Sequence, residues 1–66
     1  MNTENIGKNL KEILTALGLT QAEAAEQCGV SQAALSQIIH GMRLPSVSTM
    51  VQILKAFNVQ FERLLK

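Results

Sequence analysis

Few side chains in this sequence could perform nucleophilic or metal chemistry. It has one cysteine, one histidine and five glutamates, and it has no aspartate. There are no two Cys and no two His that could share a metal ion. A Cys/His nucleophile pair would require Cys28 and His40 to meet, whereas a lone Cys is ordinarily a small buried hydrophobe. We therefore expect no enzyme, no metal site and no cofactor.

Length and composition set further limits. The chain has 66 residues, which suits one small domain spanning residues 1–66. Apolar residues make up 47% and charged residues 17%, a globular composition rather than a disordered one. The polar start, Met1 to Glu4, predicts no signal peptide, and no apolar stretch approaches the ~20 residues that span a membrane. A single cysteine in such a chain suits the reducing cytoplasm.

The apolar pattern is helical throughout. Apolar residues recur every three or four positions and predict helices over residues 4–17, 21–27, 32–40 and 47–57, followed by a short helical turn around 61–65. Gly18, Gly29 and Gly41 follow the predicted ends as C-terminal glycines. Thr20 and Ser31 precede predicted starts as N-caps, Thr20 within a capping box. We therefore predict an all-α domain of five short helices.

Residues 20–40 carry the most specific pattern. Two short helices meet at Gly29 with about three residues between them, which forces a sharp crossing instead of an antiparallel hairpin. Ala25, four residues before Gly29, supplies the small side chain that such a crossing requires. The apolar residues on the inward side of the pair are Ala24, Cys28, Val30, Leu35 and Ile38.

The chain closely resembles the phage-repressor and Cro-type (lambda-repressor-like, XRE) helix-turn-helix family. The resemblance rests on the segment from Leu19 to Ile38 and continues through Gly41 and Pro45 to Leu65. It implies a lambda-repressor-like DNA-binding domain of five helices. It also implies a transcriptional regulator, a repressor, that binds a double-stranded DNA operator sequence-specifically as a homodimer. The second helix of the motif, residues 32–40 here, would lie in the major groove.

The resemblance also implies which residues contact DNA. Base edges would be contacted by Gln32, Ala33, Ser36 and Gln37, and the DNA backbone by Gln21, Ser31, His40, Arg43, Lys8 and Lys11. The residue types fit, because glutamine can pair with adenine N6 and N7 and a small alanine can touch a thymine methyl. The plain alternatives are a solvated polar helix face, an N-cap at Ser31, helix-end residues at Gln21 and His40, and an ordinary loop charge at Arg43.

The sequence departs from the family's pattern in its charges. Many members pair an Arg on the first helix with a Glu late in the motif, where this chain has Leu14 and Ile39. The net charge is only +1, which neither argues for a nucleic-acid partner nor excludes one. About 2–3 phosphates would be neutralised per protomer, so we expect useful affinity only from a dimer. In the loop that carries the single charge Arg43, we expect Met42 and Leu44 to cover the core.

Apolar residues near the C-terminus predict the dimer contact. Val59, Phe61, Leu64 and Leu65 present more apolar surface than one short helix can bury, and the family commonly dimerises in this region. The alternative function is an antitoxin or another protein-interaction module on the same fold, with a toxin or other protein as the partner. Weak basicity favours that alternative, whereas the lack of a disordered tail, by which many antitoxins hold their toxins, counts against it.

Overall fold

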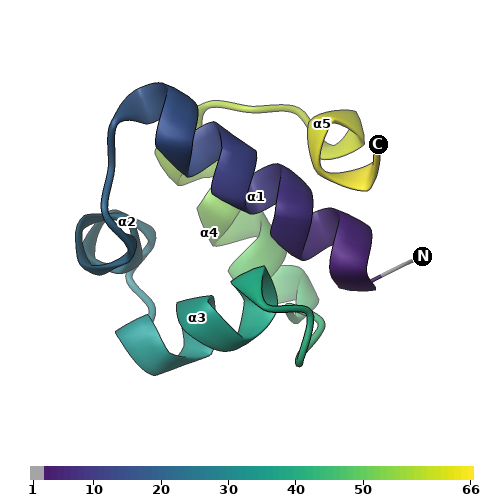
Figure 1. The fold of residues 1–66 in the computed structure, drawn as a ribbon. Helices are drawn as coiled ribbons and strands as arrows, with labels where there is room; N and C mark the ends of the chain where they lie inside the picture. The colour runs from purple at the N-terminus through teal and green to yellow at the C-terminus, as the bar shows by residue number, and fades with distance from the viewer. Residues whose placement is uncertain (1–2) are drawn as a thin grey trace.

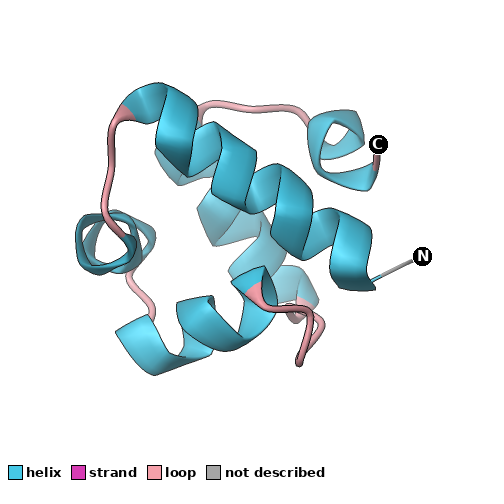
Figure 2. Cartoon of the chain, viewed as in Figure 1, coloured by secondary structure: helices cyan, strands magenta, loops and turns pink. Residues whose placement is uncertain are grey.

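The computed structural model describes residues 3–66; Met1 and Asn2, which belong to the polar start considered above, lie outside the described residues. Five helices and no strand occur in this range, namely α1 (Thr3–Leu17), α2 (Gln21–Cys28), α3 (Gln32–Ile39), α4 (Val47–Phe57) and α5 (Phe61–Leu65) (Figures 1 and 2). The all-α prediction is confirmed, and each predicted helix end falls within one residue of the observed end.

The helices surround one core. In Figure 1, α1 crosses the front of the molecule, α2 lies at one end of it, α3 lies below and α4 behind. α1 packs against α3 and α5, and α2 packs against α3 and α4. All five helices contribute to the buried cluster of Ile6, Leu10, Ile13, Leu14, Ala24, Ala25, Cys28, Leu35, Ile38, Ile39, Met50, Ile53, Phe57 and Leu64. Among the described residues, no helix has both the length and the apolar character needed to cross a bilayer.

The predicted helix ends are confirmed by their hydrogen bonds. The Thr20 hydroxyl accepts from the Glu23 N–H at 3.1 Å, and the Glu23 carboxylate accepts from the Thr20 N–H at 2.9 Å, which completes the capping box. The Thr20 backbone N–H, and after it the Thr20 side chain, hold the pKa of the Glu23 carboxyl below its ordinary value of 4.5. α4 ends without glycine, because Asn58 adopts the left-handed conformation (φ 53°) that asparagine tolerates.

A glycine inside α1 lets that helix press directly on α3. A Cβ atom placed on Gly7 would lie 2.4 Å from the carbonyl oxygen of Ile38 and 2.5 Å from that of Ile39. The backbone at the end of α3 is therefore seated against a flat patch of α1. Leu14 and Ile39, the apolar residues at the positions of the family's ion pair, are both buried in the same core.

A buried asparagine ties α5 to α1. Asn9 is 7% exposed, and its Nδ2 donates to the carbonyl oxygen of Leu64 at 2.8 Å. Burying an amide without a partner is unfavourable, and this bond satisfies both the Asn9 amide and a carbonyl of the last helical turn. The bond fixes how the short α5 sits on the long α1.

Two predicted side-chain positions are wrong. Met42 and Leu44 do not cover the core, since they are 76% and 46% exposed. Gly41 turns the chain in the left-handed conformation (φ 74°), and the Met42 N–H donates to the Gln37 carbonyl at 2.9 Å. These constraints hold the loop on the outside of α3, so its side chains face solvent.

Candidate nucleic-acid interface

The turn between α2 and α3 fixes the angle at which α3 leaves the core. Gly29 takes the left-handed conformation (φ 73°), and Val30 N–H donates to the Ala25 carbonyl at 3.1 Å. The Ser31 hydroxyl then accepts from Ala34 N–H at 3.1 Å and starts α3. Ala25 is buried at this crossing, as the sequence predicts. A rigid, fully capped turn therefore sets the orientation of α3.

α3 has one buried side and one polar, uncharged side. Leu35, Ile38 and Ile39 enter the core. On the outer side, the predicted base-contacting residues Gln32, Ala33 and Gln37 are exposed and Ser36 is half-buried. The side chains that face solvent along α3 are thus amides, a methyl group and a hydroxyl, which are the groups that can distinguish base edges in a major groove.

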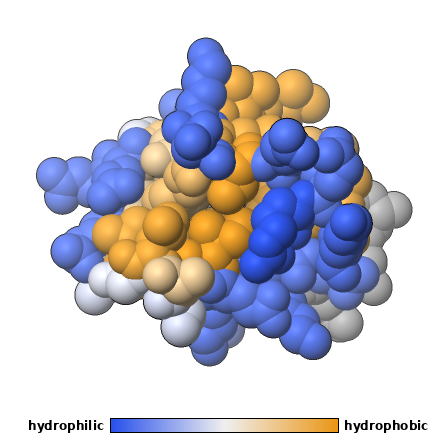
Figure 3. Space-filling model, turned by 90° about the horizontal axis from the view of Figure 1, so that it is seen from above, coloured by the Kyte–Doolittle hydropathy of each residue, from blue (hydrophilic) through white to orange (hydrophobic). Residues whose placement is uncertain are grey.

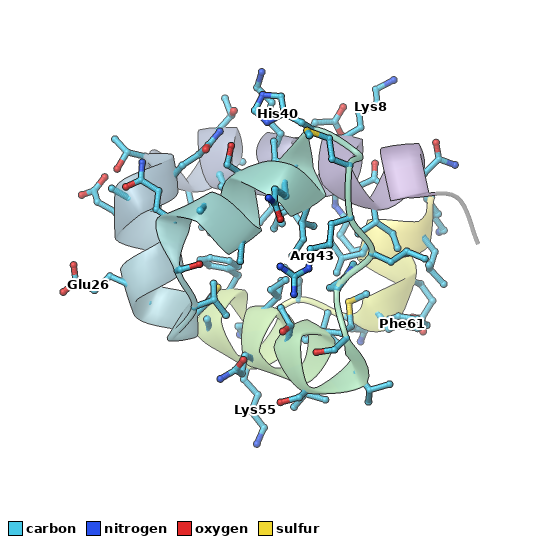
Figure 4. All side chains as sticks on the ribbon, turned by 90° about the horizontal axis from the view of Figure 1, so that it is seen from below. Lys8, Glu26, His40, Arg43, Lys55 and Phe61 are labelled. Carbon is cyan, nitrogen blue, oxygen red and sulfur yellow. The ribbon has the colours of Figure 1, made fainter. Side chains whose placement is uncertain are left out.

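The loop after α3 adds a cation to the same face. In Figure 4, the Arg43 side chain lies between α3 and α4, near the centre of the underside of the molecule. Its Nη1 donates to Oε1 of Gln37 at 3.4 Å. The structure therefore brings together two residues that the sequence places in different roles, one toward bases and one toward the DNA backbone.

His40 lies at the edge of this face. The sequence predicts His40 as the last residue of the helix. In the structure α3 ends at Ile39, and His40 is its C-cap (φ −85°, ψ 5°). Its Nδ1 is 2.8 Å from the Ser36 carbonyl oxygen and 3.3 Å from the Ser36 hydroxyl. Because a carbonyl oxygen only accepts, Nδ1 carries the proton and Nε2 is left free for an external partner. This contact bends the ring back along α3, where the Ser36 carbonyl also accepts from the His40 N–H at 3.0 Å.

The other residues predicted to contact the DNA backbone are spread over α1, the start of α2 and the turn before α3. Gln21 is half-buried at the first position of α2, and the Ser31 oxygen accepts the capping bond while its O–H stays free to donate. Lys8 and Lys11 are exposed on the outer side of α1. Figure 4 shows Lys8 beside His40 at the rim, pointing away from α3. The two lysines therefore flank the α3 face and are not grouped with Gln37 and Arg43.

Known proteins with a helix-turn-helix are similar to this chain in sequence. The sequence profile of the HTH_3 family, described as helix-turn-helix, matches residues 10–64 of the chain. The chain belongs to the HTH_3 helix-turn-helix family. It is 38% identical over 53 residues to the HTH-type transcriptional regulator PuuR of Escherichia coli (strain K12), covering 80% of this chain and 29% of PuuR. It is 34% identical over 61 residues to ImmR, an HTH-type transcriptional regulator of Bacillus subtilis (strain 168), covering 92% of this chain and 48% of ImmR.

Solved structures share the fold. An HTH_3 family transcriptional regulator from Vibrio cholerae superimposes with a TM-score of 0.90 at 29% identity, covering 98% of this chain and 36% of that one. The restriction-modification controller protein C.AhdI from Aeromonas hydrophila has a TM-score of 0.88 at 24% identity, and the match covers 94% of both chains. This helix-turn-helix chain spans less than half the length of the curated relatives named above.

The predicted dimer residues of this helix-turn-helix protein divide into two groups. Leu64 is fully buried (0% exposed) in the core, so its side chain packs within this chain and offers no surface to a partner. Phe61 and Leu65 are 41% and 37% exposed, and Val59 packs partly against the core. Phe61 also lines an apolar groove together with Pro45, Ser46, Val47, Met50, Val51 and Leu54. Figure 3 shows apolar surface between hydrophilic side chains on the upper side of the molecule.

The sequence reasoning missed residues that support the helix-turn-helix unit from outside it. Gly7 and Asn9 were not singled out, yet they set how α1 meets α3 and α5. The available signals were a glycine in a strong helical pattern, which often marks a close approach, and an amide next to the apolar stripe. Groups of three or more metal-ligating side chains are not found among the described residues.

Proposed function

We propose that the protein binds duplex DNA sequence-specifically with α3 in the major groove and represses transcription as a homodimer. The observation that carries the proposal is the outer side of α3. Gln32, Ala33 and Gln37 are exposed on a helix whose orientation is fixed by caps at both ends, and Arg43 lies beside them. A rigid helix with exposed amides suits direct recognition of base edges, because each correct pairing needs defined geometry.

The charges around α3 support a dimer as the functional form. α3 carries no charged residue, Arg43 contacts Gln37 on it, and Lys8 and Lys11 flank the face as exposed cations on α1. With about 2–3 phosphate contacts per protomer, a dimer has about 4–6, which gives a slope of log K against log salt of about −4 to −5. Two α3 helices would then occupy half-sites about one helical turn apart.

The test is selection of binding sites from random duplexes at two salt concentrations. We expect one sequence to be enriched by the wild type, and this preference to be lost by the double variant Gln32→Ala plus Gln37→Ala. The matched control is Gln52→Ala plus Gln60→Ala, which removes two exposed glutamines outside α3. If the control loses the preference as well, or if no sequence is enriched at low salt, the proposal is wrong.

The dimer is tested separately through the outer side of α5. Phe61→Glu places a charge on an exposed apolar residue, while Leu64 keeps its place in the core. We expect this variant to sediment as a monomer, to retain its helical content and to bind a single half-site weakly. Tight binding of one protomer to one half-site would contradict the dimer proposal.

Repression requires only occupancy, since a protein seated on an operator that overlaps a promoter excludes the polymerase. A reporter placed behind the selected sequence should therefore be silenced by the wild type and released by the double glutamine variant. A DNA target and a single buried thiol both suit the cytoplasm. Absence of any DNA preference would instead support the alternative of a protein partner, such as a toxin.

A further inference from the structure

Gln37 is held from the loop that follows its own helix. Met42 N–H donates to the main-chain carbonyl of Gln37 at 2.9 Å, and Arg43 Nη1 donates to its side-chain Oε1 at 3.4 Å. Gly41, in the left-handed conformation, turns the chain so that both consecutive residues reach back to Gln37. The backbone bond fixes the start of the loop, and the side-chain bond connects the guanidinium to the amide that faces solvent.

The chemistry of this contact determines which end of the amide is free. A guanidinium group has donors only, so it can face only the oxygen of a glutamine amide. With Oε1 toward Arg43, the Nε2 group with its two hydrogens is the end left to an external partner. Gln37 would thus present donors to a base edge.

We propose that Arg43 is a positioning residue that turns the oxygen of Gln37 toward the loop and its Nε2 hydrogens toward the bases, so that Gln37 favours a guanine. Guanine offers two neighbouring acceptors in the major groove, O6 and N7, whereas the pairing of glutamine with adenine requires the amide to accept from N6 and donate to N7 together. Because the oxygen keeps a second lone pair, the preference comes from the direction in which Arg43 turns the amide, and an amide free of Arg43 could turn its oxygen to adenine N6. This inference rests on the proposed function and adds the base that one residue of α3 selects.

The surroundings of the pair support this role. Both side chains are exposed, so the pair lies on a face that is open to DNA. Arg43 keeps further N–H groups after donating to Gln37, and these remain available to a phosphate. In Figure 4, Arg43 lies centrally on the underside, whereas Lys8 lies at its rim. A loss of charge at Lys8 is therefore a matched control for a loss of charge at Arg43.

The experiment measures base preference at every operator position for the wild type, Arg43→Met, Gln37→Ala, the double variant and Lys8→Met. Gln37→Ala identifies the base pair that Gln37 contacts. At that pair we expect the wild type to prefer guanine over adenine by between about 5-fold and about 150-fold, the range for one good bidentate contact. Arg43→Met should bring this ratio close to parity and also weaken binding to all sequences. Lys8→Met should weaken binding to all sequences and leave the ratio unchanged.

Several results would overturn the inference. Preference for adenine by the wild type, or an unchanged guanine ratio in Arg43→Met, shows that Arg43 does not orient Gln37. A change of preference in Arg43→Met that persists in the double variant shows that Arg43 contacts a base itself. If the base preference changes at no operator position in Gln37→Ala, then Gln37 contacts no base and the inference is wrong. These outcomes differ from failure of the wild type to enrich any sequence, which would instead refute DNA recognition as such.

Discussion

Replacing Gly7 by alanine should destabilise the protein, although alanine is the better helix former. In an exposed helix interior this change gains about 0.5–1 kcal/mol, because the unfolded chain loses less freedom. Here the new Cβ would lie 2.4 Å and 2.5 Å from two carbonyl oxygens of α3 and 2.9 Å from the Ile39 carbonyl carbon. Ordinary C···O contacts are about 3.3–3.6 Å, so α1 and α3 must separate by about 1 Å.

The cost of that separation exceeds the gain in helix propensity. Overpacking a tight core costs about 1–3 kcal/mol, and the atoms in the way are backbone atoms that cannot rotate aside. The net loss should be about 1–2 kcal/mol, a large part of the ~3–5 kcal/mol that a domain of this size has in reserve. In a domain of this size the loss lowers Tm by about 5–15 °C. Because the displaced atoms end α3, DNA binding should weaken too.

Gly18 provides the control, because it separates steric crowding from backbone strain. A Cβ on Gly18 meets no atom within 4 Å, but its φ of +72° disfavours any side chain. Gly18→Ala should therefore lose stability by strain alone, and Gly18→Asn should recover part of it. Gly7→Asn should lose more than Gly7→Ala. Thermal and urea unfolding followed by circular dichroism measures all four, and a stabilised Gly7→Ala variant would refute the reasoning.

Other residues give further predictions. Asn9→Asp replaces the donor to the Leu64 carbonyl with a carboxylate, which cannot donate at neutral pH. Urea unfolding should show a loss of about 1–3 kcal/mol or more in the free energy of unfolding. This loss should exceed that of the uncharged Asn9→Leu variant. The bonds from Thr20 lower the pKa of Glu23, so their stabilising contribution is present above its ordinary value of 4.5 and is lost as the pH falls through the folded-state pKa. The difference in Tm between wild type and Glu23→Gln should hence shrink in acid; a constant difference would contradict this. Burial raises the pKa of the Cys28 thiol, so a thiol reagent should label it only at the rate of unfolding, and rapid labelling of the folded protein would contradict this.

Local signals in the sequence predicted the helices well. Caps and left-handed glycines depend on neighbours within a few positions, so Thr20, Ser31 and Gly29 could be assigned before any tertiary contact was known. The buried position of Cys28 followed from its place on the apolar side of α2. The candidate contact residues on α3 were predicted through the family resemblance, and the structure places Gln32, Ala33 and Gln37 on the exposed side. Whether they contact DNA stays a prediction.

Contacts between distant segments could not be predicted in the same way. The Asn9 bond joins positions 55 residues apart, and no local pattern names its acceptor. Leu64 has the same residue type as its exposed neighbour Leu65, and only the docking of α5 on α1 decides which one is buried. The contact of Arg43 with Gln37 depends on the path of an irregular loop, which the turn at Gly41 sets.

The bond from Asn9 to Leu64 also bears on how the domain opens. α5 has five residues, far fewer than the ~12–15 that an isolated helix needs, so it is helical only while docked on α1. Fraying of α5 alone would leave the Asn9 amide without its partner and uncover the cavity that Leu64 fills. The C-terminal helix should therefore open together with the whole core, and its hydrogen-bonded amide hydrogens should exchange with solvent as slowly as those of α1.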